Sequence, residues 1–323
     1  MLPCYRAAAP REDRRTDMRA STLAWVWIAQ GIGGSTPALT KLALAGLGPF
    51  ALVVARQVLG ALFLLALARL GAAARGGTAG PEAPWTRRDW MLLGLLSWAG
   101  FALPQVLGAL GLTLSSATHG ALLSPLEPIG ILLGAALVLR EPLSAAHGIA
   151  VALGIAGTVL IVWPAGGAGA RGGDLRGDLV MAAGHLSWAI YTLAAKPLLA
   201  RHDPLRIAVR AGLLSVVPLA PLALAEPFTP ARALPSLGWV LLLACLSSGL
   251  GTVAWNRALR ELRVATMAAF VFVQPLVGLA VGVLALGEPA GASAILGAAL
   301  IVLGVLAATW AGERAAPPAL EVP

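Results

Sequence analysis

The sequence is poor in charge, lysine and cysteine, and each shortage excludes a class of protein. Only 12% of its 323 residues are charged and 58% are hydrophobic, whereas a soluble domain carries about 25% charged residues. Lysine occurs twice and no G-x-x-x-x-G-K-S/T phosphate loop is found, which excludes a nucleotide-driven pump of the P-loop type. The two cysteines, Cys4 and Cys245, imply no disulfide framework. No metal-ligand spacing and no nucleophile–base pair stands out, so no metal, cofactor or enzyme activity is expected.

Long apolar blocks make up most of the chain. A helix needs about 20 apolar residues to cross the hydrocarbon core of a bilayer, and backbone polar groups cannot stay unpaired in lipid, so such blocks are expected to be helices. We therefore predict an all-α polytopic membrane protein with ten transmembrane helices. The expected spans are residues 22–44, 49–70, 90–112, 117–139, 143–163, 178–199, 204–225, 236–258, 264–286 and 290–311.

The net charge of +8 is distributed as a topology signal. If the N-terminus is cytoplasmic, most Lys and Arg residues fall in segments on that side, and the opposite side holds only Arg171, Arg176 and Arg232. This bias is the positive-inside rule. It favours a multi-pass inner-membrane protein with both termini cytoplasmic over a nucleic-acid-binding protein.

Two stretches of the sequence nearly repeat each other at an offset of 147 residues. "EPIGILLGAALVLREP" (127–142) and "QPLVGLAVGVLALGEP" (274–289) share their proline, several leucines and the final Glu-Pro. "WMLLGLLSWAG" (90–100) likewise resembles "WVLLLACLSSG" (239–249). The chain is therefore expected to contain two similar five-helix halves.

Five is an odd number of crossings, so the second half must enter the membrane in the opposite orientation. Inverted repeats of this kind surround a central site and alternate its access between the two sides. We assign residues 20–165 to the first repeat, 166–177 to a Gly-rich linker and 178–312 to the second repeat. Residues 1–19 and 313–323 are assigned to cytoplasmic tails.

Several motifs give the sequence a family resemblance. The Trp- and Gly-rich first block ends in "PALTKLAL", Arg56 lies in the second block, and "RALRELRVATMAAFVFVQP" spans 257–275. With the Glu-Pro pattern of the fourth and ninth blocks, these residues resemble the drug/metabolite transporter superfamily, EamA type, over about residues 20–312. The resemblance implies ten spans, a central cavity and transport of small metabolites, often amino acids, without ATP hydrolysis. Gln274 stands where the first half has Glu127, so an acidic role cannot be symmetric.

The predicted function is secondary active transport of small organic metabolites by alternating access, with export of amino acids or related amphipathic compounds as the first candidate. A multidrug, sugar or nucleoside permease is the alternative transporter. An integral-membrane enzyme or sensor is the alternative of another class, although the longest segment between blocks, 71–89, is only a short linker. The expected partners are a small-molecule substrate and the lipid bilayer, with protons as a candidate coupling ion and the oligomeric state open.

Glu127 is the candidate for proton coupling because it lies about ten residues into the fourth predicted span. A charged side chain at that depth costs roughly 2.5–3.5 kcal/mol, and protonation removes the cost. Local capping or pairing near Pro128 is the alternative role. Arg56 is a candidate for a forked bond to a substrate carboxylate, with pairing to another buried group or snorkelling as alternatives.

Other candidates share helical faces. His185, Trp188 and Tyr191 follow one another at spacings of three residues, which suits a cavity wall, with helix–helix packing as the alternative. Trp98 and Gln105, seven residues apart, are expected to share a face of the third span. The predicted substrate-binding residues are Gln30, Arg56, Trp98, Gln105, Glu127, His185, Trp188, Tyr191 and Gln274.

Overall fold

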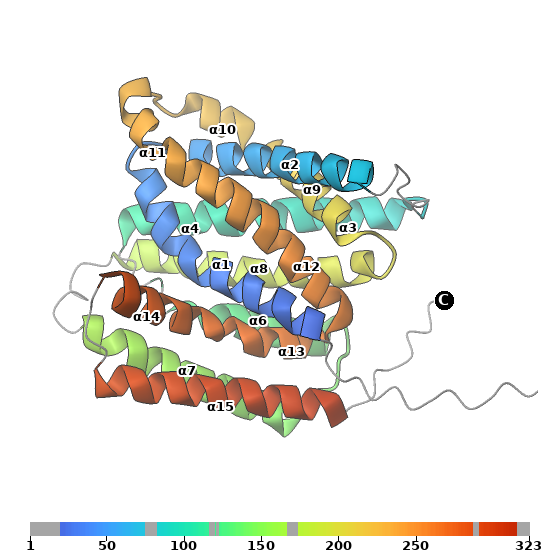
Figure 1. Ribbon diagram of the computed structural model, residues 1–323, viewed down its shortest axis with the longest axis vertical. Helices are drawn as coiled ribbons and strands as arrows, with labels where there is room; N and C mark the ends of the chain where they lie inside the picture. Colours follow the sequence, from blue (N-terminus) through green and yellow to red (C-terminus); the bar gives the residue numbers. More distant parts are fainter. Residues whose placement is uncertain are drawn as a thin grey trace, which may run out of the picture.

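The computed structural model describes residues 20–74, 83–115, 120, 123–166, 174–286 and 291–314, and in these residues every regular element is a helix (Figure 1). The elements labelled η are π-helices. The helices of the N-terminal half are α1 Ala20–Leu44, α2 Pro49–Ala74, α3 Arg87–Ser97, η1 Trp98–Ala102, α4 Leu103–Leu114, α6 Leu126–Leu137 and α7 Ala145–Gly166. Those of the C-terminal half are α8 Leu175–Leu199, α9 Pro204–Val216, α10 Ala220–Ala225, α11 Pro230–Leu242, η3 Leu243–Gly251, α12 Thr252–Glu261, α13 Val264–Val271, α14 Val273–Leu286 and α15 Ala292–Arg314.

In the described residues, each predicted apolar block overlaps one or more helices. In the part of the chain that is described, the helical segments Pro49–Leu70, Arg87–Leu114 and Pro230–Glu261 are long and apolar enough to cross a membrane by length and composition. Shorter apolar helices occupy four further segments, at Leu126–Leu137, Ala145–Ile161, Val264–Val277 and Ala292–Ala308. The helical class predicted from the sequence is therefore confirmed, and the arrangement as ten inverted spans stays a prediction.

Prolines explain where continuous helices differ from the predicted blocks. The block 204–225 divides into α9 and α10, and Pro218 and Pro221, which have no N–H to continue the ladder, lie at the division. The block 264–286 divides at Phe272, because Pro275 cannot donate to the carbonyl four residues before it.

The fourth predicted block also begins later than expected. The continuous helix α6 starts at Leu126, with Pro125 as its N-cap, whereas the predicted span starts at 117. Proline is tolerated in the first turn of a helix and not in its interior. The positions of Pro125 and Pro128 therefore agree with a helix that starts at Leu126. Glu127 therefore lies in the first turn of α6. Residues 116–119 and 121–122, which include the start of the predicted span, lie outside the described part, so the depth of Glu127 in the membrane stays a prediction.

The two halves are interleaved. α2 packs against η3 and α9, α1 packs against α12 and α14, and α8 packs against α3, α4 and α6. α7 and α15 form a separate antiparallel pair along one side of the bundle (Figure 1). Their contact relies on small residues, since a Cβ added to Gly157 would lie 2.5 Å from the carbonyl oxygen of Gly297. The other helices enclose most of the space described next, and α7 and α15 contribute Ile161, Ser293 and Ala294 to its wall.

Candidate functional site

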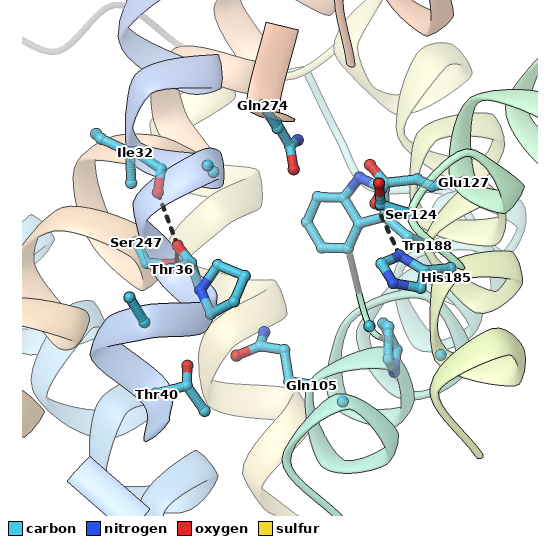
Figure 2. Close-up of a pocket in the computed structure, with 18 of the residues that line it drawn as sticks. Ile32, Thr36, Thr40, Gln105, Ser124, Glu127, His185, Trp188, Ser247 and Gln274 are labelled. Atoms are coloured by element: carbon cyan, nitrogen blue, oxygen red, sulfur yellow. Dashed lines mark hydrogen bonds and ion pairs between the residues drawn. The ribbon is translucent and has the colours of Figure 1, made fainter. Parts of the chain in front are cut away.

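A cavity of about 920 Å³ lies in the middle of the bundle between helices of both halves (Figure 2). Its wall is mostly apolar, with a few polar side chains directed inward. This is the usual composition of a small-molecule site. The polar and aromatic lining residues include Thr36, Thr40, Arg56, Phe101, Gln105, Ser124, Glu127, His185, Trp188, Ser247, Thr252, Trp255 and Gln274.

The cavity occupies only one half of the length of the bundle. On α1 the lining residues fall between 29 and 40, on α2 between 52 and 56, on η1 and α4 between 101 and 112, and on α8 between 181 and 188. The cavity therefore extends toward the end at which α1 finishes and α2 begins. We call the opposite end, where α1 and α3 begin and α8 finishes, the closed end (the right side of Figure 1).

An aromatic cluster of Phe101, Trp188, Tyr191 and Trp255 ends the cavity toward the closed end. Trp188 stacks on Tyr191 with ring centroids 4.8 Å apart, and it meets Trp255 edge-on at 6.0 Å. The Tyr191 hydroxyl donates to Asn256 Oδ1 at 2.9 Å. Beyond the cluster the bundle is filled by buried apolar side chains such as Leu93, Leu96, Leu198, Leu199 and Leu259.

Arg56 brings a buried positive charge to the cavity wall. The residue is 4% exposed; its Nε donates to Ser248 Oγ at 3.0 Å and its Nη2 donates to Ser247 Oγ at 2.6 Å. Both serines lie on the π-helix η3, which approaches α2 closely because Gly60 has no Cβ. Among the described residues no carboxylate forms an ion pair with Arg56.

Glu127 and His185 face each other on another part of the wall. Glu127 Oε2 lies 3.6 Å from His185 Nδ1, and their side chains are 12% and 25% exposed. Figure 2 shows both residues beside Trp188, across the cavity from Ser247. The pair joins α6 of the N-terminal half to α8 of the C-terminal half, so two titratable side chains meet at a contact between the halves.

Two glutamines complete the polar lining. Gln274 Nε2 donates to Gln30 Oε1 at 3.1 Å, and a Cβ on Gly33 would lie 2.9 Å from that nitrogen, so glycine makes room for the bond. Gln105, which Figure 2 places on the opposite side of the cavity from Gln274, has a buried Oε1 without a protein partner. A ligand with N–H or O–H groups would supply the missing donor.

The cavity brings together six of the nine predicted substrate-binding residues, and they are Arg56, Gln105, Glu127, His185, Trp188 and Gln274. Gln30 is fully buried behind Gln274 and contacts the cavity only through it. Tyr191 is also fully buried, because the ring of Trp188 covers it. Gln30 and Tyr191 therefore do not line the cavity in this structure, since other side chains cover them, and their part in substrate binding stays a prediction.

Trp98 also does not line the cavity, for a different reason, and its part in substrate binding likewise stays a prediction. Its side chain is 49% exposed on the outside of the bundle, and its Nε1 donates to the carbonyl of Leu214 at 2.8 Å. A seven-residue spacing shares a face only in an α-helix, whereas 98–102 form a π-helix with wider turns, which rotates Trp98 away from Gln105. Thr36 and Thr40 also line the cavity, although they are not among the predicted residues. Their four-residue spacing in a Gly-rich helix is a sequence signal that could have identified them.

A mostly apolar cavity with a few inward polar groups, inside a bundle of apolar helices, is compatible with a membrane transporter, and sequence comparison identifies the family. The chain matches the EamA-like transporter family over residues 21–163 and 175–310. It therefore belongs to the EamA-like transporter family, within the drug/metabolite transporter type. Family membership and the apolar helices together indicate a multi-pass membrane protein.

Similar proteins are named as transporters. A protein of Streptantibioticus cattleyicolor, named a probable terminal-alkyne amino-acid exporter, is 31% identical over 245 residues, which cover 75% of this chain and 80% of that protein. The uncharacterized transporter YyaM of Bacillus subtilis is 24% identical over 226 residues, covering 68% of this chain and 72% of that protein. A protein of known crystal structure has the same fold, with a TM-score of 0.72 over 92% of this chain and 99% of its own at 22% identity. These names point to a transporter and away from an enzyme.

Proposed function

We propose that the protein is a secondary active transporter that exports amino acids or related amphipathic compounds across the inner membrane by alternating access. In this proposal ten spans form two inverted repeats, and both termini lie in the cytoplasm. The one-sided cavity is the observation that carries the proposal. Ligand reaches a chamber that ends at the aromatic cluster near mid-bundle, and it can leave on the other side only after the interleaved halves repack.

The substrate class is supported by the cavity and by the relative. Arg56 suits a carboxylate, and the aromatic cluster suits an apolar side chain. The name of the relative from Streptantibioticus cattleyicolor, a probable terminal-alkyne amino-acid exporter, supports an amino acid as the substrate. We also propose that Glu127, with His185 at 3.6 Å, binds the proton that is exchanged for substrate.

The test is tracer exchange in proteoliposomes loaded with unlabelled apolar amino acids. The wild-type protein should accumulate labelled amino acid against its concentration gradient. Gly108 lines the cavity and has nothing within 4 Å of an added Cβ, so Gly108→Trp should place its ring in the chamber and stop exchange. Gly94 has the same open surroundings but does not line the cavity, so Gly94→Trp is the matched control and should stay active.

Other outcomes distinguish the alternatives. Exchange of sugars, nucleosides or cationic drugs without exchange of amino acids would identify a different permease. Equal activity of the Gly108→Trp and Gly94→Trp variants would reject this cavity as the transport route.

A further inference from the structure

The described residues that line the cavity include one cation and one anion, held on different walls. Among the described lining residues, Arg56 and Glu127 carry formal charges, and His185 is charged only when protonated. Ser247 binds Arg56 at 2.6 Å, and Figure 2 places Ser247 across the cavity from Glu127. A ligand that bears both charges is therefore complementary to the cavity as a whole.

Arg56 has no carboxylate partner among the described residues. Burial of a charge is costly unless it is paired, yet its described partners are two neutral hydroxyl groups. Guanidinium has five N–H donors, and the two bonds to serine leave others for a ligand. A carboxylate in the cavity would supply the missing charge, so carboxylate binding at Arg56 is favourable before any change in the bundle.

Glu127 differs because it already has a partner. His185 Nδ1, on α8, lies 3.6 Å from Glu127 Oε2, a contact that is an ion pair when the imidazole is protonated. The α-ammonium of an amino acid lies only one carbon from its carboxylate. A ligand held at Arg56 by its carboxylate is therefore too short to contact Glu127 on the far wall, and its ammonium group reaches Glu127 only when the walls approach each other.

We propose that the two charges have separate tasks, with Arg56 binding the carboxylate of the ligand and Glu127 meeting its ammonium group only as the cavity closes. This inference rests on the proposed amino-acid transport and adds a selection rule. A ligand with the carboxylate alone binds and is not carried, because it gains nothing from closure. An interaction that forms only in the closed cavity lowers the free energy of closure for the correct substrate alone, and so selects which ligand is transported.

The experiment compares leucine with two derivatives that each remove one charge. Leucine and N-acetyl-leucine should both raise the melting temperature of the purified wild-type protein, and leucine methyl ester should not. In proteoliposomes only labelled leucine should exchange, and N-acetyl-leucine should inhibit that exchange without being carried. Exchange of N-acetyl-leucine at the rate of leucine overturns the proposal, and this result needs no variant.

Two variants assign the residues. Arg56→Gln should weaken binding of leucine and N-acetyl-leucine roughly ten-fold or more, the loss expected for one charge-assisted hydrogen bond. Glu127→Gln should bind both and exchange neither. If leucine exchanges and both variants match the wild type, amino-acid transport stands and the two-charge mechanism fails. If leucine does not exchange but another solute class does, the proposed function itself fails.

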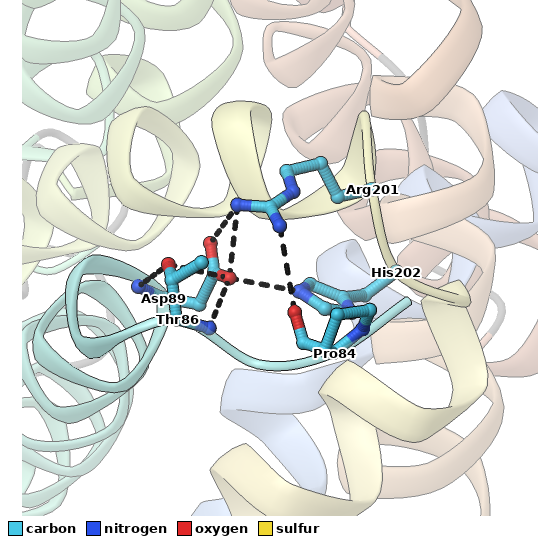
Figure 3. Close-up of polar contacts among 5 residues, drawn as sticks. All are labelled: Pro84, Thr86, Asp89, Arg201 and His202. Atoms are coloured by element: carbon cyan, nitrogen blue, oxygen red, sulfur yellow. Dashed lines mark hydrogen bonds and ion pairs between the residues drawn. The ribbon is translucent and has the colours of Figure 1, made fainter. Parts of the chain in front are cut away.

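A second, independent inference concerns the closed end. There the segment before α3 docks on the turn between α8 and α9 (Figure 3). Asp89 forms an ion pair with Arg201, Oδ2 to Nη1 at 3.1 Å, and its Oδ2 lies 3.4 Å from His202 Nε2. Arg201 Nη2 also donates to the Pro84 carbonyl at 3.4 Å. These contacts join the N-terminal half to the C-terminal half.

Aromatic packing adds to these polar contacts. Trp85 stacks on the His202 ring with centroids 3.9 Å apart, and the Arg210 guanidinium lies 4.3 Å above Trp85. The Asp89 and His202 side chains are 4% and 0% exposed. Thr86 fixes Asp89 through a capping box, in which each residue binds the backbone N–H of the other.

We infer that Asp89, Arg201 and His202 form a latch that keeps the closed end shut and must release before ligand passes. The apolar layer that separates the latch from the cavity includes Leu96, which is fully buried. When the latch is released, this layer opens to water. A reporter cysteine at Leu96 therefore measures how often the closed end opens.

The test uses Leu96→Cys with Cys4 and Cys245 replaced by serine, and follows maleimide labelling in detergent. Asp89→Asn should raise the labelling rate several-fold. Asp203→Asn is the control, because Asp203 caps α9 within its own half by accepting from Leu205 N and Arg206 N. Equal labelling of the reporter with and without Asp89→Asn overturns the latch.

Arg201→Gln provides a second variant in case Asp89→Asn lowers the yield of folded protein. The Arg201 side chain is 42% exposed, and its removal leaves the capping box intact. Arg201→Gln should also raise the labelling rate. An unchanged rate in that variant rejects the latch even if Asp89→Asn does not fold.

Discussion

Glu141 accepts a hydrogen bond from the backbone N–H of Val264 at 3.1 Å across 123 positions of sequence. Its second carboxylate oxygen accepts from the N–H of Ala265 at 3.0 Å, so a side chain of the N-terminal half caps α13 of the C-terminal half. Helix N-termini favour a negative charge and need acceptors for their free N–H groups. The contact therefore stabilises the closed end in addition to the latch.

Glu141→Leu should destabilise the protein by about 1–3 kcal/mol, the cost of leaving buried donors unsatisfied. Glu141→Gln should cost less, because one oxygen still accepts. Thermal melting in detergent measures both changes. A Glu141→Leu variant as stable as the wild type would contradict the capping role.

Gly157 provides a test of the α7–α15 pair. A Cβ on Gly157 would lie 2.5 Å from the backbone oxygen of Gly297, so Gly157→Ala requires the helices to separate and should lower the melting temperature. Gly148, on the same helix, has nothing within 4 Å of an added Cβ. Gly148→Ala should be neutral or stabilising, since alanine favours helix by about 1 kcal/mol over glycine. Equal melting temperatures for the two variants would show that the close approach is not required.

Tyr191 should be important for stability and not for ligand contact. Tyr191→Phe removes the donor to Asn256 Oδ1 and leaves a buried acceptor unpaired, which costs about 1–3 kcal/mol. Trp188 lines the cavity in front of it, so Trp188→Leu should weaken ligand binding directly. Ligand titration and thermal melting of the two variants separate the roles. Weaker ligand binding in a fully stable Tyr191→Phe variant would be the contrary result.

Glu127→Gln tests proton coupling. In proteoliposomes with an imposed pH gradient, the variant should lose uptake driven by the gradient, because its amide cannot bind and release a proton and also lacks the charge that meets the ammonium group of the ligand. Asp174→Asn changes an acid that caps α8 outside the cavity and should leave driven uptake intact. Gradient-driven uptake that persists in Glu127→Gln would assign the coupling to another group.

Much of the fold could be predicted from the sequence because length and hydropathy alone locate apolar helices. That Arg56 and Glu127 face the interior could be predicted for a related reason, since a charge inside an apolar block is costly unless it lies against polar groups or a cavity. The outward direction of Trp98 could not be predicted, because periodicity assumes an α-helix and the π-turn at 98–102 breaks that assumption. The contact of Asp89 with His202 joins segments far apart in the chain, and no local pattern records such a partner.

The interleaving of the halves has a consequence for biosynthesis. Arg56 is synthesised long before Ser247, the hydrogen-bond acceptor 191 positions later. Until Ser247 is made, the Arg56 guanidinium lies in the membrane without this acceptor. A nascent chain halted after α7 would contain such unfinished contacts. The insertion machinery or the lipid headgroups must interact with these unpaired groups until the C-terminal half is synthesised. The N-terminal half expressed alone should therefore be degraded, and co-expression of the C-terminal half should prevent that degradation.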